Sequence, residues 1–557
     1  MMVPSTVYLL LLGIFGTLMV GDCLTHSESV QQNLIVNTRL GQLRGSRLET
    51  WTNQAFFAFR GVPYAEPPVG KLRFKAPVPV KKWKGMWNAT SDAAVCPQIG
   101  GETVGPNNED CLYLNVYSKK LDDKNPVIVY FHPGGFFAMT GASYWNGPDY
   151  LMNEDVVLVT INYRLDALGF LSTGDEEAEG NYGLKDQVAA LRWVKSHISN
   201  FGGDPDSVTL VGYSAGSAST YYHMLSPMSK GLFHKVIAMS CGVTQRGLIS
   251  KNPMQFTKKL AGLFNCSLPS SKEIIDCLRK IPASNITSQY DAMRSFYNSP
   301  IVVFGPVIED FNTTSERFLL DEPVKLIKKK QYNHVPVVTG IVKDEFRGWF
   351  NWMYNAIEDE VKSFNDNFYK ILPVILLYDD KTEDEKRKIT DEFKKFYLNG
   401  ETINNNTIDG LGDLFADATI IHGEHTTAKL LAKYNNAPVY FYMMNYLGRF
   451  GHVKDTRTGK VMGPTHHDDL IYIFYVSKLF PKFNTTDPES TMVKRLTTFW
   501  SSFAYSGNPT PTNSSVQWLP IKDNDLKYLD LDKDLNMVDG LPYPKRMGIW
   551  DSLFPID

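Results

Sequence analysis

One serine stands in a setting that suits a nucleophile. Ser214 lies in the run Gly212-Tyr213-Ser214-Ala215-Gly216, with a glycine two residues away on each side. Such glycines are needed where a strand turns sharply into a helix and presents a serine at the tip, because bulky neighbours would clash there. The turn also places the serine at a helix N-terminus, where the helix dipole favours a developing negative charge. The pentapeptide arises by chance in about one chain in five of this length, so its surroundings must support the prediction.

A glycine pair offers the complementary part of an acyl-transfer site. Gly134 and Gly135 follow the apolar run 127–131 after His132 and Pro133. Small residues in succession let backbone N–H groups converge on one point, and the amide that follows the nucleophile, that of Ala215, adds a further donor. Pro133 has no N–H, so Gly134 and Gly135 are the predicted oxyanion donors. The alternative is an ordinary glycine-rich turn after a strand.

A serine nucleophile needs a base, and the base needs an acid that orients it. Among eleven histidines, His466 lies in a turn-forming loop late in the chain, which suits the order serine, acid, histidine. The adjacent His467 satisfies the pattern equally well. For the acid, Asp344 and Glu345 follow the predicted strand 335–339, and catalytic groups in such sheets lie beyond the carboxyl ends of strands. Spacing does not choose between these two carboxylates.

The remaining histidines are expected in structural roles. His132 is predicted to shape the oxyanion turn, and His197, His223 and His234 lie in helix-like segments beside apolar residues. His422 and His425 are spaced like a metal pair, but no third ligand completes a site. We therefore expect neither a metal nor a cofactor.

The segments around these residues predict a mostly parallel sheet covered by helices, an α/β fold. Continuous apolar runs, which indicate strands buried on both faces, occur at 127–131, 156–161, 208–211, 335–339 and 439–442. Between the second and third runs, residues 183–194 show helical spacing and predict a crossover helix. A further apolar helix is expected at 470–475. The polar, helix-rich regions 251–333 and 350–436 are predicted to be insertions that build a cap over the sheet edge.

The ends and the composition indicate an exported protein. Residues 7–20 form a short apolar stretch, which predicts a signal peptide over about residues 1–23 and a single domain over 24–557. A membrane anchor there is the alternative, but the run is shorter than the ~20 residues of a spanning helix, and the C-terminus carries no apolar tail. The net charge of −3 argues against nucleic-acid binding. Oligomeric state is not predicted.

Cysteines and sequons agree with export. The simplest pairing of the six cysteines joins Cys96 to Cys111 and Cys266 to Cys277, leaving Cys241 as a buried small hydrophobe and Cys23 beside the signal peptide. Glycosylation is expected at the seven Asn-x-Ser/Thr sequons, which are Asn88, Asn265, Asn285, Asn312, Asn405, Asn484 and Asn513.

Four further motifs extend the pattern across nearly the whole mature chain. They are Phe-Arg-Gly-Val-Pro-Tyr-Ala-Glu-Pro-Pro-Val-Gly at 59–70, Glu-Asp-Cys-Leu-Tyr-Leu-Asn-Val-Tyr at 109–117, Asn-Tyr-Arg at 162–164 and Gly-Asn-Tyr-Gly-Leu-Lys-Asp-Gln at 180–187. With the serine motif, they resemble the type-B carboxylesterase and cholinesterase family. The overall pattern is similar to that of an insect secreted carboxylesterase of the venom or glandular kind.

This resemblance implies an α/β-hydrolase fold and a serine esterase that hydrolyses a small-molecule ester. It implies a triad of Ser214, Glu345 and His466, since the family motif Gly-x-x-His ends at His466 and the acid matches the second residue of Asp344-Glu345. It also implies the Gly134, Gly135 and Ala215 oxyanion hole and the same two disulfides. A lipase of longer acyl esters and a non-enzymatic binding member of the same fold are the alternatives.

Three departures narrow the expected substrate. Tyr213 replaces the glutamate that is common in cholinesterases, and it is not the glutamine usual in juvenile hormone esterases. Phe346 replaces a glycine that is common after the acid. The loop 97–110 contains no aromatic residue, so the family's choline-stacking tryptophan is missing and a cation–π site there is not expected.

Overall fold

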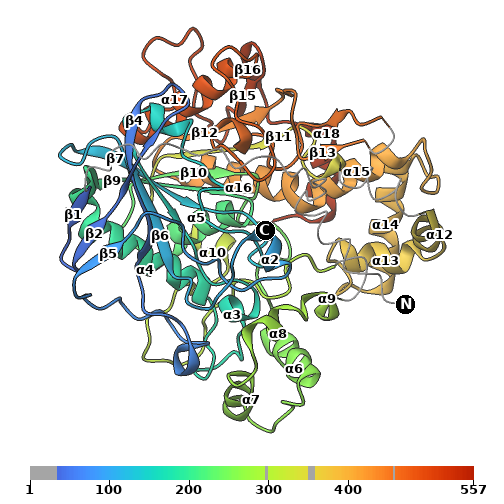
Figure 1. Ribbon diagram of the computed structural model, residues 1–557. Helices are drawn as coiled ribbons and strands as arrows, with labels where there is room; N and C mark the ends of the chain where they lie inside the picture. The colour runs from blue at the N-terminus through green and yellow to red at the C-terminus, as the bar shows by residue number, and fades with distance from the viewer. Residues whose placement is uncertain (1–33, 295–298, 349–357, 456–457, 557) are drawn as a thin grey trace.

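A computed structural model describes residues 34–294, 299–348, 358–455 and 458–556 (Figure 1). Its centre is an eleven-stranded sheet in the order β16-β15-β12-β11-β10-β9-β7-β8-β6-β4-β3. In chain order the strands are β3 (Ser46–Glu49), β4 (Ala55–Pro63), β6 (Tyr113–Ser118), β7 (Asn125–Phe131), β8 (Val157–Ile161), β9 (Gly203–Tyr213), β10 (Lys235–Met239), β11 (Val337–Val342), β12 (Val439–Met444), β15 (Lys527–Leu531) and β16 (Leu535–Asp539).

Parallel pairing dominates the middle of the sheet. The strands from β8 through β7, β9, β10, β11 and β12 to β15 pair in parallel, whereas β3, β4, β6 and β16 pair antiparallel at the two edges. All residues of β7, β8, β10, β11 and β12 are buried. The five predicted strands are therefore confirmed, with β11 beginning two residues later than predicted. Two smaller sheets lie outside this one, namely β1 (Ile35–Asn37), β2 (Gln42–Arg44) and β5 (Met86–Asn88), and the pair β13 (Val453–Lys454) and β14 (Val461–Met462).

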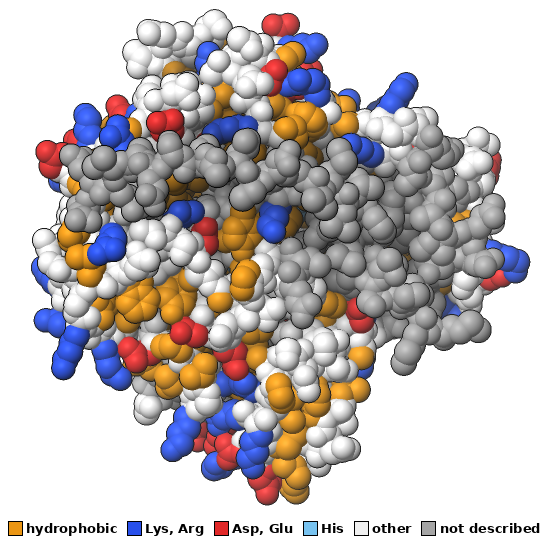
Figure 2. Space-filling view, viewed as in Figure 1, with side chains coloured by type: hydrophobic (Ala, Val, Ile, Leu, Met, Phe, Trp, Pro, Cys, Tyr) orange, Lys and Arg blue, Asp and Glu red, His pale blue; other side chains and the backbone are white. Residues whose placement is uncertain are grey.

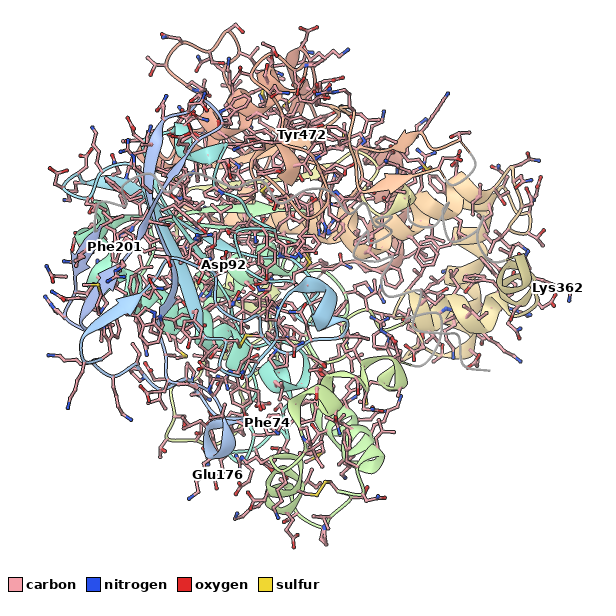
Figure 3. The ribbon with its side chains drawn as sticks, viewed as in Figure 1. Phe74, Asp92, Glu176, Phe201, Lys362 and Tyr472 are labelled. Atoms are coloured by element: carbon pink, nitrogen blue, oxygen red, sulfur yellow. A yellow bond between two sulfur atoms is a disulfide. The ribbon has the colours of Figure 1, made fainter. Side chains whose placement is uncertain are left out.

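Helices cover both faces of the sheet. Side chains of β7 alternate between two hydrophobic clusters: Val127, Val129 and Phe131 join one, and Ile128 and Tyr130 join the other. The first cluster includes α4 (Tyr182–His197), α5 (Ala215–Leu225) and α16 (His422–Tyr434), and the second includes α17 (Ser490–Ser506). Figure 3 shows the side chains as sticks and labels Phe201. The ring of Phe201 contacts the rings of Phe59 and Trp193.

The crossover helix α4 is fixed to the loop after β8 by a buried ion pair. Arg164 donates to both carboxylate oxygens of Asp186, at 2.6 and 2.8 Å, and the backbone N–H of Arg164 donates to Oδ2 as well. The two side chains are 4% and 0% exposed. Paired in this way, the charges satisfy each other in the core, and the pair ties together the Asn-Tyr-Arg and Lys-Asp-Gln motifs.

The two regions predicted to be insertions are helical, but α16 at the end of the second region packs on the sheet itself, against β11 and β12, and is not part of an insertion. The first contains α6 (Pro253–Leu263), α7 (Ser271–Leu278), α8 (Ala283–Thr287), α9 (Tyr290–Met293) and α10 (Pro323–Lys328), and the second contains α12 (Glu358–Asp366), α13 (Phe368–Ile375), α14 (Glu383–Leu398), α15 (Ile408–Ala416) and the π-helical turn 417–421. In Figure 1, α6 to α8 lie at the bottom of the molecule and α12 to α15 at the right. The helix expected at 470–475 is instead a single 3-10 turn, Leu470–Tyr472.

The cysteines from Cys96 onward and the seven sequons, which indicate export, all lie among the described residues. Cys96 is bonded to Cys111 and Cys266 to Cys277, while Cys241 is free and buried. All seven sequon asparagines are exposed. Figure 2 shows basic and acidic side chains interspersed over the described part of one face. Within the described residues, we find no helix with both the length and the apolar character of a membrane span. The predicted signal peptide lies outside the described residues.

Candidate active site

Ser214 stands at a strained turn between β9 and α5. Its φ of 54° and ψ of −120° are outside the regions that non-glycine residues prefer. A Cβ on Gly212 would overlap the carbonyl of Gly216, and one on Gly216 would overlap the carbonyl of Phe131 at the end of β7. The two glycines therefore let the nucleophile turn press against the neighbouring strand. This is the geometry that exposes a serine hydroxyl at the top of the sheet.

Glu345 and His466 meet beside this turn from two other strand ends. Glu345 follows β11, and its Oε2 lies 2.6 Å from Nδ1 of His466. The other carboxylate oxygen accepts the N–H of Val342 at 2.9 Å. The N–H of His466 donates to the carbonyl of Glu345, so backbone and side chain both join the acid to the histidine loop. Glu345 is 0% exposed and His466 is 2% exposed.

The second ring nitrogen of His466, Nε2, is buried and unpaired among the described residues. Burial lowers the pKa of His466 to about 3, because a charge is costly away from water. At neutral pH the ring is therefore neutral. Burial raises the pKa of Glu345 to about 8. When Glu345 is ionised it accepts the proton of Nδ1, which leaves the lone pair on Nε2, the arrangement of a general base.

The other candidates, Asp344 and His467, are not part of the contact between Glu345 and His466. Asp344 is partly exposed and pairs with Arg347 at 3.3 Å. The backbone N–H of His467 donates to the hydroxyl of Tyr213. The choice that spacing left open is thus made by burial and by direct contact, in favour of Glu345 and His466.

The glycine pair forms a turn with free amides beside Ser214. Gly134 and Gly135 have φ values of 109° and 58°, and a Cβ on Gly134 would overlap the carbonyl of Ala138. In the described part of the chain, the N–H groups of Gly134, Gly135 and Ala215 donate to no other residue. Three backbone donors without a partner are what an oxyanion requires.

His132 and Tyr163 support this turn from below. The two rings stack at a centroid distance of 4.3 Å, and the Tyr163 hydroxyl donates to the carbonyl of His132 at 3.0 Å. His132 is 1% exposed, and burial lowers its pKa to about 4. It is therefore a neutral packing residue, in agreement with the sequence prediction.

Aromatic and acidic neighbours of the triad were not predicted from the pattern. The ring of Phe346 stacks on that of His466 at a centroid distance of 4.3 Å, and the ring of Tyr213 contacts the same imidazole at a centroid distance of 5.0 Å. Glu424 on α16 and Asp469 are fully buried, and burial raises the pKa of each to about 8. The departures at Tyr213 and Phe346 were visible in the sequence, but only the fold places them on His466. Nothing in the sequence around Glu424 distinguishes it from a solvated helix residue.

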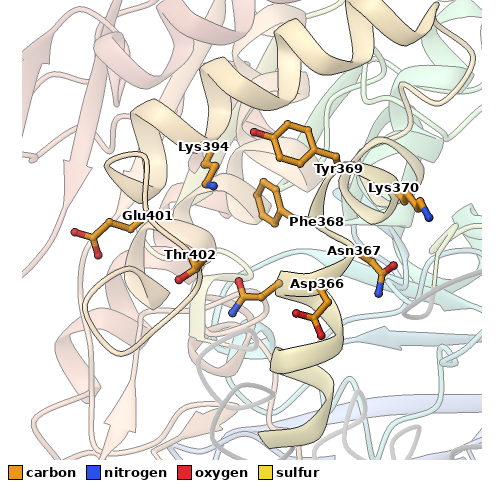
Figure 4. Close-up of a pocket in the computed structure, with 9 residues that line it drawn as sticks. Asp366, Asn367, Phe368, Tyr369, Lys370, Lys394, Glu401 and Thr402 are labelled. Carbon is orange, nitrogen blue, oxygen red and sulfur yellow. The ribbon is translucent and has the colours of Figure 1, made fainter.

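The insertions approach the site through aromatic contacts. The ring centroid of Phe137, close after the oxyanion turn, lies 4.5 Å from that of Tyr290 of α9. The pocket in Figure 4 is a different feature, a cavity of about 170 Å³ formed by residues of α12, α13 and α14 and the segment after α14. None of its lining residues belongs to the triad or to the oxyanion turn.

Comparisons with known proteins agree with this geometry. The sequence model of the Carboxylesterase family matches residues 32–550. Esterase E4 of Myzus persicae is 38% identical over 92% of this chain and 93% of its own length, and the juvenile hormone esterase of Tribolium castaneum is 36% identical over 87% and 85%. The crystal structure of juvenile hormone esterase from Manduca sexta, with OTFP covalently attached, has a TM-score of 0.84 and 28% identity, covering 94% of this chain and 100% of that one. With its α/β-hydrolase fold, this chain belongs to the carboxylesterase family and is a carboxylic ester hydrolase.

Proposed function

We propose that the protein hydrolyses neutral carboxylic esters through an acyl-enzyme on Ser214. The observation that carries the proposal is the 2.6 Å contact between the buried Glu345 and Nδ1 of His466 beside the strained Ser214 turn. In the first step the Ser214 proton moves to Nε2 of His466, the Oγ–carbonyl bond forms, and the amides of Gly134, Gly135 and Ala215 hold the oxyanion. The alcohol then leaves with the proton from Nε2.

Water completes the cycle by the same route. His466 removes a proton from water, the hydroxide attacks the acyl carbonyl, and Ser214 regains that proton from His466 as the carboxylic acid leaves and then ionises in solvent. Glu345 holds the ring in one tautomer and stabilises the imidazolium that forms in both steps.

The proposed preference for neutral esters rests on the residue before the nucleophile. Tyr213 is 0% exposed, and burial raises the pKa of its phenol well above the usual value, so no negative charge stands there to attract a quaternary ammonium group. We further propose that the protein is a secreted glycoprotein, which the seven exposed sequons and the two disulfides support.

Replacement of the serine tests the proposal. We expect Ser214→Ala to lower kcat for a short-chain aryl ester by about 10⁵- to 10⁶-fold, with an unchanged melting temperature. An organophosphate should label the wild-type protein on the peptide that contains Ser214 and should leave the variant unlabelled. Turnover by the variant at the wild-type rate would refute the role of Ser214.

The same assay separates a short-ester carboxylesterase from a lipase. Aryl esters of increasing acyl length are compared by kcat/KM. A maximum at short chains supports the proposal, and a steady rise toward long chains favours the lipase alternative.

A further inference from the structure

Three rings contact the ring of His466: the adjacent His467, at a centroid distance of 4.6 Å, and Phe346 and Tyr213, each a sequence neighbour of another triad member. Phe346 follows Glu345 and stacks on the imidazole with an interplanar angle of 28° and a centroid distance of 4.3 Å. Tyr213 precedes Ser214 and meets the imidazole at 63° and 5.0 Å. The residues beside the acid and beside the nucleophile therefore both pack on the base.

Tyr213 makes a second contact that acts on the backbone. Its hydroxyl accepts the N–H of His467 at 2.8 Å. His467 has a φ of 82°, in the left-handed region that non-glycine residues rarely adopt. Since the N–H of His466 is held by the carbonyl of Glu345, two consecutive amides of the histidine loop are tied to the two neighbouring triad segments.

The ring of a catalytic histidine needs more than one restraint. The contact between Glu345 and Nδ1 fixes one atom of the imidazole but allows the ring to tilt about that point. Stacking by Phe346 restricts tilting on one side, and the ring of Tyr213 restricts it on another. A displacement of about 1 Å at a reacting group lowers the rate by about 100-fold, so these restraints bear directly on proton transfer at Nε2.

We propose that Tyr213 and Phe346 are positioning residues that together hold the His466 imidazole in its productive orientation. This inference rests on the proposed function. Phe346 has a further effect, because the ring face that stacks on neutral His466 also faces the imidazolium formed during turnover. An aromatic face attracts a cation, so Phe346 stabilises the charged form at the moment it appears.

Single substitutions test the two residues separately. Tyr213→Phe keeps the ring and removes only the hydroxyl. We expect kcat to fall about 10-fold and KM to stay within about twofold, because the loop is loosened while the substrate contacts remain. For Phe346→Leu we also expect kcat to fall about 10-fold, because stacking and the cation–π contact are both lost.

Matched controls exclude a general loss of packing. The hydroxyl of Tyr378, between α13 and α14, lies 2.7 Å from Thr390 and is equally buried, so Tyr378→Phe should keep the wild-type kcat. Phe256→Leu on α6, which removes a partly buried ring packed against Phe304, serves the same purpose for Phe346. Wild-type kcat in both Tyr213→Phe and Phe346→Leu would overturn the proposal, as would equal losses in the control variants.

Amide hydrogen exchange gives a measurement that needs no activity. In the wild type, the amide of His467 should be protected, and in Tyr213→Phe its exchange should be faster while peptides of α14 are unchanged. An unprotected His467 amide in the wild type would overturn the role of the hydroxyl even if the variant failed to fold. Ser214→Ala distinguishes failure of the proposed function from failure of this inference. An active Ser214→Ala refutes the proposed function, whereas an inactive Ser214→Ala with fully active Tyr213→Phe and Phe346→Leu variants refutes only the positioning role.

Discussion

Asp344 and Glu345 are adjacent carboxylates with opposite surroundings. Glu345 is fully buried against His466, and Asp344 is partly exposed beside Arg347. Because an orienting acid works through one hydrogen bond to the imidazole, Glu345→Gln should lower kcat by about 10⁴-fold with little change in KM, as the amide favours the wrong tautomer. Steady-state kinetics with a short aryl ester measure the effect.

The neighbouring carboxylate is the matched control for this substitution. Asp344→Asn should keep kcat within about twofold of the wild type, because exposed ion pairs contribute little. If Asp344→Asn were the more damaging change, the acid would be assigned to the wrong residue.

The pH profile provides a separate prediction about His466. Ester attack requires the neutral imidazole, which is lost when the pH falls below the pKa of His466. Burial lowers this pKa from the usual 6.5, so the neutral form persists to more acidic pH. The acidic limb of kcat/KM should therefore have its midpoint below pH 6.5, in an assay where preincubation at each pH shows that the enzyme stays folded. A midpoint above pH 6.5 would contradict this prediction and would mean that the negative charge of Glu345, and not burial, controls the pKa of His466.

At the scale of single residues, the sequence pattern predicted a serine, a carboxylate and a histidine, but not which carboxylate pairs with which histidine. The roles of the glycines around Ser214 and after Pro133 could be predicted, because a side chain at these positions would clash with neighbouring atoms. The choice of Glu345 over Asp344, and of His466 over His467, came only from the family resemblance. It depends on which side chain turns inward, and neighbouring residues in a loop have no periodicity that reports this.

At the scale of secondary structure elements, the contact between α4 and the loop after β8 should be sensitive to a single substitution. Arg164→Met would leave Asp186, which is 0% exposed, without its partner. Removing one member of a buried pair costs about 3–5 kcal/mol, and urea unfolding should show a loss of this size.

The same helix carries a surface pair that serves as the control. Arg192 and Glu316 are 48% and 62% exposed, so Arg192→Met should change the free energy of unfolding by no more than about 1 kcal/mol. Equal effects of the two substitutions would show that burial does not control the strength of the pair.

Burial explains much of which strands could be predicted, although the fully buried β10 was missed. The central strands β7, β8, β11 and β12 were found because both of their faces are covered, which makes their residues continuously apolar. The edge strands were not predicted: β16 is half-buried or exposed along its whole length. The apolar run 470–475 predicts a helix, but apolar character alone does not distinguish a helix from a buried 3-10 turn that is followed by irregular backbone.

For the molecule as a whole, the seven exposed sequons make a prediction about its surface. Expressed through a eukaryotic secretory pathway, the protein should lose mass on treatment with an amidase that removes N-linked glycans, with asparagine converted to aspartate at sequon positions only. Asn115, which is buried and lies outside any sequon, is an internal control. An intact mass equal to that of the bare polypeptide would exclude glycosylation and weaken the proposal of secretion.

The overlap that a side chain at Gly216 would make with the carbonyl of Phe131 has a consequence for changing this enzyme. The nucleophile turn and the strand that leads to the oxyanion turn are packed so closely that neither can move without the other, and they behave as one inflexible part. Directed evolution of substrate preference should therefore leave β7, β9 and α5 unchanged. Libraries are better aimed at the separate helices 253–293, where Tyr290 contacts Phe137 close to the oxyanion turn. The chemistry can then be retained while the choice of ester is altered.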